Sequence, residues 1–203
     1  MVTSQIFSQL LNLKPGEQRS QSGVSWLEYE DLAARGEQQS LHLKISYLDG
    51  ILEVMSPDIR HEAPKKRINI LLEDYLLLKR IPYFAKGSAD IRKPSQRSGK
   101  QPDESYCIGT SSDLDPPDLV LEVIHTSGTI KNLKENYRRL GVKEIWIWQN
   151  EKLSAYYLQG EEYYQTSSSK VLPELPLELL EKYAAREDIL QARLEWREAI
   201  EER

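Results

Sequence analysis

One carboxylate stands where the sequence otherwise has apolar residues. Glu122 interrupts residues 119–124, whose other members are leucine, valine and isoleucine. Such a run predicts a buried strand, and a charged side chain is rarely buried without a partner or a metal ion. A second carboxylate, Asp103, begins the preceding expected strand, residues 102–109. If the two strands are neighbours, the carboxylates converge and form a suitable ligand pair for Mg²⁺ or Mn²⁺.

This ligand pair indicates hydrolysis of a phosphodiester. A divalent ion lowers the pKa of a bound water and offsets the charge that builds on the phosphate. A nearby lysine would orient the attacking water or neutralise the transition state. Lys131 and Lys134 lie on the helix expected after the central strand, within reach of its end. Asp103 and Glu122 are therefore expected as metal ligands, with Lys134 or Lys131 as the catalytic cation.

Each of these residues also has a purely structural interpretation. Asp103 follows a proline and could simply begin a turn, and Glu122 could form a buried ion pair with an arginine or lysine. Asp118 follows two prolines, so it is expected as a strand-opening residue, with an additional metal ligand as the alternative. Glu53 lies on an expected hairpin and faces solvent by pattern alone. His61 precedes a helix, where a capping or surface role competes with a functional one.

The first elements of the chain are expected to be a helix and a hairpin. Ser25 and Glu28 have the spacing of a capping box, so a helix is expected to start there and to end near Gly36. Alternating apolar residues on both sides of an Asp-Gly pair predict a β-hairpin over residues 41–55.

A second helix is expected next, with Pro64 in its first turn and its end before Pro82. A strand around residues 83–91 and a polar loop over residues 93–101 should follow it.

The central part of the chain predicts a βαβ unit. The strand at residues 117–124 is followed by an apolar stripe at helical spacing, which ends at Gly141, and then by a strand at residues 144–148. The two strands should be parallel, with a right-handed crossover. A hairpin turn is expected at residues 150–152, and a single helix should run through the C-terminal residues to Arg203.

Composition describes a soluble globular protein. The 203 residues carry a net charge of -5, so contact with nucleic acid would need a local basic patch. The basic stretches are residues 65–67 and the residues Arg92, Lys93, Arg97 and Lys100. A single cysteine and the absence of a targeting pattern favour the cytoplasm, and no apolar run is long enough to span a membrane.

The expected organisation is one domain with appendages. Residues 1–22 are interpreted as an N-terminal leader, residues 23–170 as the main domain and residues 171–203 as a C-terminal helical extension. His125 follows the central strand, but no second histidine stands at ligand spacing, so zinc is not expected.

The motifs resemble those of the Uma-two family of bacterial restriction endonucleases. The resemblance extends over about residues 48–158, and its specificity lies in the order of the motifs. These motifs are residues 49–57 with His61, residues 101–109, residues 117–123, residues 126–128 and residues 137–146.

This resemblance implies an α/β fold of the restriction-endonuclease-like (PD-(D/E)XK) class, with a mixed central β-sheet flanked by helices. The family's two carboxylates fall on Asp103 and Glu122, and the resemblance adds Glu53 as a candidate site carboxylate. Ile124 occupies the place of the lysine that usually follows two residues after the second carboxylate. The family's alternative lysine on the next helix falls on Leu133 or Asn132, with Lys131 and Lys134 on either side.

The expected function is that of a Mg²⁺-dependent (or Mn²⁺-dependent) endonuclease that hydrolyses DNA. The alternative is a catalytically impaired binding or assembly module on the same fold, and a third option is a nuclease that acts only within a complex. DNA is the expected substrate, and a homodimer would suit an enzyme that cuts two strands.

Overall fold

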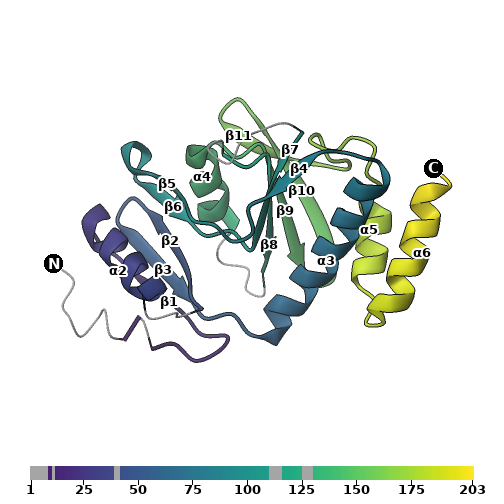
Figure 1. Ribbon diagram of the computed structural model, residues 1–203. Helices are drawn as coiled ribbons and strands as arrows, with labels where there is room; N and C mark the ends of the chain where they lie inside the picture. Colours follow the sequence, from purple (N-terminus) through teal and green to yellow (C-terminus); the bar gives the residue numbers. More distant parts are fainter. Residues whose placement is uncertain (1–8, 11, 39–41, 110–115, 125–129) are drawn as a thin grey trace.

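The computed structural model describes residues 9–10, 12–38, 42–109, 116–124 and 130–203 (Figure 1). Within these ranges the secondary structure follows the chain in this order: β1 (Gln18–Gln21), α2 (Trp26–Gln38), β2 (Lys44–Leu48), β3 (Ile51–Met55), α3 (Ile59–Leu78), β4 (Tyr83–Ala85), β5 (Ile91–Lys93), the 3₁₀ turn η1 (Pro94–Gln96), β6 (Ser98–Lys100), β7 (Glu104–Ile108), β8 (Leu119–Val123), α4 (Ile130–Leu140), β9 (Glu144–Gln149), β10 (Lys152–Gln159), β11 (Glu162–Thr166), α5 (Leu177–Ala184) and α6 (Ile189–Glu201).

The strands form two sheets. The larger sheet has the order β11-β10-β9-β8-β7-β4, and the smaller has the order β1-β3-β2-β6-β5. Strands β8 and β9 are parallel and are joined through α4, whereas the other neighbours in both sheets are antiparallel. The expected mixed sheet flanked by helices and the expected βαβ unit are therefore confirmed.

Alternation along the central strands separates two layers of core. Leu121 of β8 and Trp146 of β9 pack with α3, α5 and α6 on one face of the larger sheet. Val120 and Ile145 pack with α4 on the other face. Because side chains of a strand alternate between faces, Glu122 points to the face of α4.

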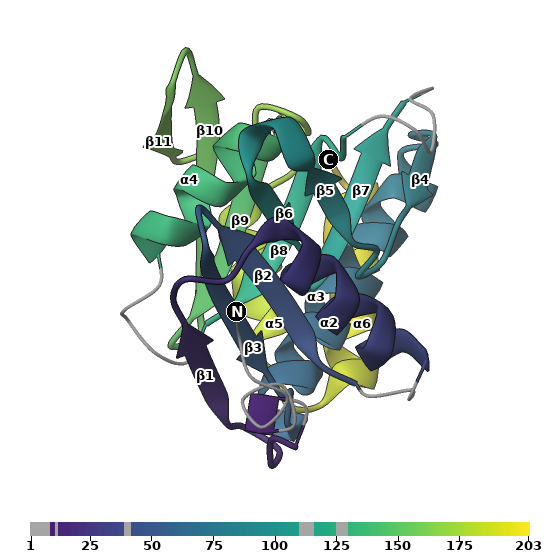
Figure 2. The ribbon, with the colours of Figure 1, turned by 90° about the vertical axis from the view of Figure 1, so that its left-hand side faces the viewer.

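The smaller sheet packs against a helix of its own. Helix α2 lies across its outer face (Figure 2), and Tyr29 of α2 packs against Tyr47 and Val54 of the sheet. The expected capping box starts this helix, because the Ser25 hydroxyl donates to the Glu28 carboxylate over 2.7 Å and accepts from the Glu28 N–H over 3.3 Å. The Asp49-Gly50 turn joins β2 to β3, as expected for the hairpin.

Helix α3 begins five residues before the expected proline. The Asp58 side chain accepts hydrogen bonds from the backbone N–H groups of Arg60 and His61, so the helix starts at Ile59. Pro64 consequently lies in the second turn instead of the first. The expected end before Pro82 is confirmed, since α3 ends at Leu78.

Two further expectations were wrong in detail. The single strand expected around residues 83–91 is two strands, β4 and β5, which belong to different sheets. The polar loop expected over residues 93–101 contains β6, which pairs with β2 and β5. Strands of three residues have too few side chains to show an alternating pattern, so the sequence did not reveal β6.

The C-terminal region forms two helices instead of the one that was expected. Asp188 caps α6 by accepting from the Gln191 N–H over 3.0 Å, and this cap separates α6 from α5. Both helices pack beside α3, where Arg193 forms a two-point ion pair with Asp74. Among the residues that the structure describes, no helix is long and apolar enough to cross a membrane.

Strand β6 passes close to α2 at Gly99. A Cβ atom added there would lie 2.7 Å from two ring carbons of Tyr29 and still closer to its hydroxyl oxygen. Tyr29 is fully buried, so its ring has no free space to move into. We therefore expect Gly99→Ala to lower the free energy of unfolding by about 1–3 kcal/mol, as overpacked cores do, measured by urea denaturation.

Gly36→Ala provides the matched control for this substitution. Gly36 lies in α2, and an added Cβ would meet Ile45 at an ordinary contact distance of 3.7 Å. Alanine there should raise the free energy of unfolding by about 0.5–1 kcal/mol because it restricts the unfolded chain. Equal effects of the two substitutions would contradict the proposed close approach at Gly99.

Candidate functional site

A cavity of about 370 Å³ opens between the smaller sheet and the layer formed by β8 and α4. Strands β2, β3 and β6 contribute one side, and α3, β8 and α4 contribute the other. Apolar side chains such as Ile51 and Leu133 line part of it. Its titratable residues are Lys44, Glu53, Asp58, Arg60, His61, Lys100, Asp103 and Glu122.

Asp103 and Glu122 both line this cavity. Glu104 of β7 pairs with Leu121 of β8, so the antiparallel register continues with Asp103 opposite Glu122. The Asp103 carboxylate accepts a hydrogen bond of 2.7 Å from the backbone N–H of Val123. Only 2% of Asp103 and 6% of Glu122 is exposed. Two carboxylates are therefore held side by side with very little access to bulk water.

Asp103 has two basic partners. Its Oδ2 atom lies 2.9 Å from Nε2 of His61, and its Oδ1 atom lies 3.4 Å from Nζ of Lys44. Burial acts to raise the pKa of Asp103, but the hydrogen bond from His61 and the charge of Lys44 outweigh it and hold the pKa below its ordinary value. The ionised form of Asp103 is thus favoured.

The pKa values of the two partners of Asp103 shift in opposite directions. Burial acts to lower the pKa of His61, yet the hydrogen bond and charge of Asp103, together with those of Glu62, outweigh it and raise the pKa above its ordinary value. Burial lowers the pKa of Lys44 in spite of the opposing charges of Asp103 and Glu122. The Lys44 ammonium also donates to the backbone carbonyl oxygen of Pro102. Lys44 is therefore fixed in place by a carboxylate and a backbone group.

Glu122 has a different pair of partners. The hydroxyl of Tyr137 on α4 donates a hydrogen bond to Oε1 of Glu122, and Nζ of Lys100 lies 3.3 Å from the same oxygen. Burial raises the pKa of Glu122, and the charge of Asp103 adds to this effect, whereas Lys100 and Tyr137 act against it. Glu122 therefore holds a proton more readily than a carboxyl group in water.

Of the remaining candidates, Glu53 lines the cavity and Asp118 does not. The Ser46 hydroxyl lies 3.4 Å from the Glu53 carboxylate, on the same face of the smaller sheet as Lys44. Asp118 accepts from the Ile108 N–H over 2.8 Å and pairs with Lys143 over 2.6 Å. These contacts are those of a residue that fastens the start of β8 to its neighbours.

Neither lysine expected on α4 lines the cavity. Lys131 is exposed, and Nζ of Lys134 lies 3.5 Å from the centroid of the Tyr156 ring, where burial lowers the pKa of the ammonium. The side chains that α4 contributes to the cavity are Asn132, Leu133 and Asn136. His125, the other residue expected near this strand end, lies outside the described residues.

Lys44, Lys100 and Tyr137 were not expected in the site. Lys44 occupies the polar face of a hairpin strand, where a lysine is ordinary. Lys100 was assigned to a solvated basic loop, because β6 has no recognisable pattern. Tyr137 was placed on the apolar stripe of α4, and only its hydroxyl reaches Glu122. One clue was present in the sequence, since Lys100 stands three residues before Asp103.

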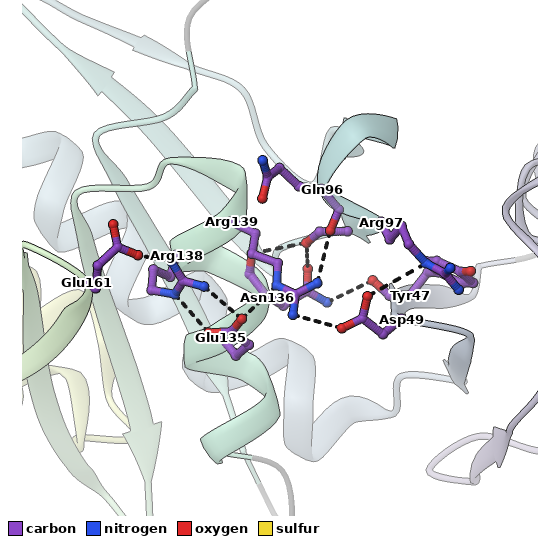
Figure 3. A network of polar contacts seen from close by, with 10 residues as sticks. Tyr47, Asp49, Gln96, Arg97, Glu135, Asn136, Arg138, Arg139 and Glu161 are labelled. Atoms are coloured by element: carbon purple, nitrogen blue, oxygen red, sulfur yellow. Dashed lines mark hydrogen bonds and ion pairs between the residues drawn. The ribbon is translucent and has the colours of Figure 1, made fainter.

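Asn136 of α4 fastens the helix to the smaller sheet (Figure 3). The Ser98 hydroxyl donates to the Asn136 side-chain oxygen over 2.5 Å and also lies 3.1 Å from its backbone oxygen. The Asn136 amide donates to the carbonyl oxygens of Tyr47 over 3.2 Å and Gly99 over 3.5 Å. Buried polar groups that satisfy one another in this way hold elements in a defined register. The strand that bears Lys100 is thereby positioned beside Glu122.

Charged residues continue this junction toward the surface (Figure 3). Glu135 accepts from Arg138 over 2.8 Å and from Arg139 over 2.6 Å. Arg139 also pairs with Asp49 of the β2–β3 turn over 2.7 Å and donates to the backbone oxygen of Gln96 over 3.0 Å. The arginine thus links α4 to both the hairpin and the turn before β6.

The donor atoms of the cavity fit a hard divalent ion. Among the described residues, no group of three or more His, Cys, Asp or Glu side chains has metal-binding geometry. Mg²⁺ requires fewer protein ligands than that, because it binds through one or two carboxylates and keeps several waters. Asp103 and Glu122 supply that pair, and the nearby His61 is already engaged by Asp103. The residues present therefore suit Mg²⁺ or Mn²⁺ better than zinc.

Comparison with known proteins identifies a family whose model matches this chain. The family model Uma2, described as "Putative restriction endonuclease", matches residues 26–186, which include every charged residue of the cavity. No curated protein matches the chain. Among solved structures, a crystal structure of "a putative nuclease belonging to DUF820" from Anabaena variabilis ATCC 29413 is similar over 75% of this chain and 90% of that chain, with 16% identity and a TM-score of 0.45. At that TM-score the likeness supports no inference about the site.

Glu135 allows a test of the junction by pH. The hydrogen bond from Arg138, supported by Arg139, lowers the pKa of Glu135 to about 2 from its ordinary 4.5. A lowered pKa stabilises the fold above pH 4.5, and this contribution is lost as the pH falls toward 2. Since the group is largely solvated, Glu135→Gln should cost at most about 1 kcal/mol at pH 7, and the difference from wild type should shrink below pH 4.5.

Urea denaturation of wild type and Glu135→Gln at pH 7, 4.5 and 3 measures this difference. Added salt at pH 7 should also reduce it, because solvent-exposed charges are screened. A difference that stays constant from pH 7 to pH 3 would contradict the role given to the two arginines.

Proposed function

Because this chain belongs to the Uma2 family of restriction endonucleases, we propose that it is a nuclease that hydrolyses phosphodiester bonds of DNA with a divalent metal ion. The observation that carries the proposal is the pair of buried carboxylates, Asp103 and Glu122, which open into one cavity. A structural ion pair needs one carboxylate, whereas two together in a nearly dry wall favour a multivalent cation.

The metal would be held by Asp103 and Glu122. When bound, Mg²⁺ or Mn²⁺ supplies a water of lowered pKa and offsets charge on the scissile phosphate. His61 and the Val123 N–H hold Asp103 in position from two directions, and both contacts favour its ionised form. The Tyr137 hydroxyl orients Glu122 by a hydrogen bond to Oε1, and Glu122 lines the cavity.

The cationic side chains of the cavity would meet the phosphate. Lys44 and Lys100 are partly buried, with 13% and 15% of their side chains exposed, and Arg60 lines the cavity with a largely exposed side chain. Positive charge in a cavity with low-dielectric walls attracts a phosphate backbone locally, although the whole chain has a net charge of -5.

A binding or assembly module on the same fold is the second candidate. The observation in its favour is that α4 contributes no lysine to the cavity among its described residues. Such a module would retain the cavity and its ability to bind a metal ion, but it would not cleave DNA. Cleavage assays and metal titrations together separate the two functions.

Asp103→Asn and Glu122→Gln test the proposed metal ligands. Each change removes the charge that binds the ion, so cleavage of plasmid and single-stranded DNA with Mn²⁺ should fall by about 100-fold or more. Binding of Mn²⁺, measured by isothermal titration calorimetry, should weaken in parallel. Thermal melting checks that each variant is folded.

Glu104→Gln is the matched control. Glu104 stands next to Asp103, but its side chain points to the opposite face of the sheet, where it accepts from Asn69. The amide oxygen of glutamine retains that acceptor, so cleavage and Mn²⁺ binding should remain near those of wild type. Wild-type behaviour in Asp103→Asn and Glu122→Gln would argue against the proposed site.

A further inference from the structure

The helix that should carry a catalytic lysine presents none to the cavity. Of the residues that α4 contributes there, Leu133 is apolar and Asn132 and Asn136 are uncharged. Lys134 is engaged with the Tyr156 ring, and Lys131 is exposed. If the cavity hydrolyses phosphodiesters, its transition-state cation has to come from another element.

Strand β6 brings a lysine to the corresponding place. Nζ of Lys100 lies 3.3 Å from Oε1 of Glu122 and 5.7 Å from the centroid of the Tyr137 ring. Its pairing with Ser46 of β2 sets the side chain on the cavity side of the smaller sheet. The ammonium therefore lies beside the proposed metal ligand and near the buried Tyr137 ring of α4.

We propose that Lys100, supplied by the smaller sheet, is the catalytic lysine of this site. The inference rests on the proposed function. In the reaction, a water oxygen bonds to phosphorus while the bond from phosphorus to the leaving ester oxygen breaks. One water proton passes to solvent, and the leaving oxygen takes a proton from solvent. The Lys100 ammonium keeps its own proton and contacts a non-bridging phosphate oxygen, where negative charge increases in the transition state.

Lys44 is less suited to this role. Its ammonium contacts the Pro102 carbonyl oxygen as well as Asp103, so it fixes the segment before β7 in place. The ammonium of Lys100 lies between a carboxylate and a ring face, and neither of these is a backbone group. A lysine held only by side chains can turn toward an incoming phosphate without breaking the chain's own hydrogen bonds.

The fold holds β6 closely enough for this task. Asn136 bonds to Ser98 and Gly99, the two residues before Lys100, from the helix that also carries Tyr137. Tyr29 packs against Gly99 from the opposite side of the strand. Lys100 is thus placed by contacts from both α4 and α2, and catalytic groups require such preorganisation.

The test compares Lys100→Met with Lys170→Met. Lys170 is exposed in the segment between β11 and α5, does not line the cavity and serves as the matched charge-removal control. We expect Lys100→Met to lose about 100-fold or more in Mn²⁺-dependent DNA cleavage. Its Mn²⁺ affinity, measured by calorimetry, should be unchanged or higher, because a competing cation beside Glu122 has been removed. Lys170→Met should match wild type in both measurements.

Further variants make the result decisive. Lys100→Arg should recover part of the activity, since it restores the charge with a different shape. Lys100→Gln replaces Lys100→Met if thermal melting shows that the latter is unfolded. Lys131→Met and Lys134→Met are measured alongside.

Four outcomes would overturn the proposal. Lys100→Met and Lys100→Gln could cleave as wild type does, or lose Mn²⁺ binding together with cleavage, which would indicate a structural lysine. Loss of cleavage in Lys131→Met or Lys134→Met, with Lys100→Met unaffected, would assign the role to α4. A wild-type protein that cleaves no DNA with Mn²⁺ defeats the proposed function and this inference with it, whereas wild-type cleavage alongside an active Lys100→Met defeats this inference alone.

Discussion

Two carboxyl groups buried side by side impose the main constraint on this structure. Asp103 and Glu122 lie on adjacent strands with almost no exposure to water, where their mutual repulsion and loss of hydration both oppose ionisation. Such a pair is stable only if neighbouring groups offset the repulsion and the lost hydration through hydrogen bonds or positive charge. The compensation comes from His61, Lys44, Lys100 and Tyr137, which belong to four different elements: α3, β2, β6 and α4.

This requirement explains why the protein has two sheets that meet at one cavity. The larger sheet supplies both carboxylates, but its own strands supply no cation to them. The smaller sheet supplies the two lysines, and α4 is joined to this sheet at β6 through Asn136 and at the hairpin turn through Arg139. The polar junction beside the cavity is therefore part of the site, although none of its side chains contacts the carboxylates.

Much of the larger sheet could be predicted because its signals are local. The apolar run of β8, the apolar stripe of α4 and the strand β9 each have a hydrophobic pattern that matches their secondary structure. The capping box, a motif of only four residues from Ser25 to Glu28, marks the start of α2. Strand β6 could not be predicted, since three residues of serine, glycine and lysine form a strand only when β2 and β5 lie on either side. The start of α3 was missed because the Asp58 cap lies six residues before the more conspicuous Pro64.

The sequence by itself determined where the charge is buried. An acidic residue inside an apolar strand and a second one at the start of the preceding strand are visible without any structure, because strand periodicity alone assigns their faces. Only the tertiary structure decided which cations face them. A lysine's position in the chain does not tell where its long side chain ends, so the sequence favoured Lys131 and Lys134 for their nearness in the chain to the central strand. The packing of the smaller sheet against α4 brought Lys44 and Lys100 to the carboxylates and turned the lysines of α4 elsewhere.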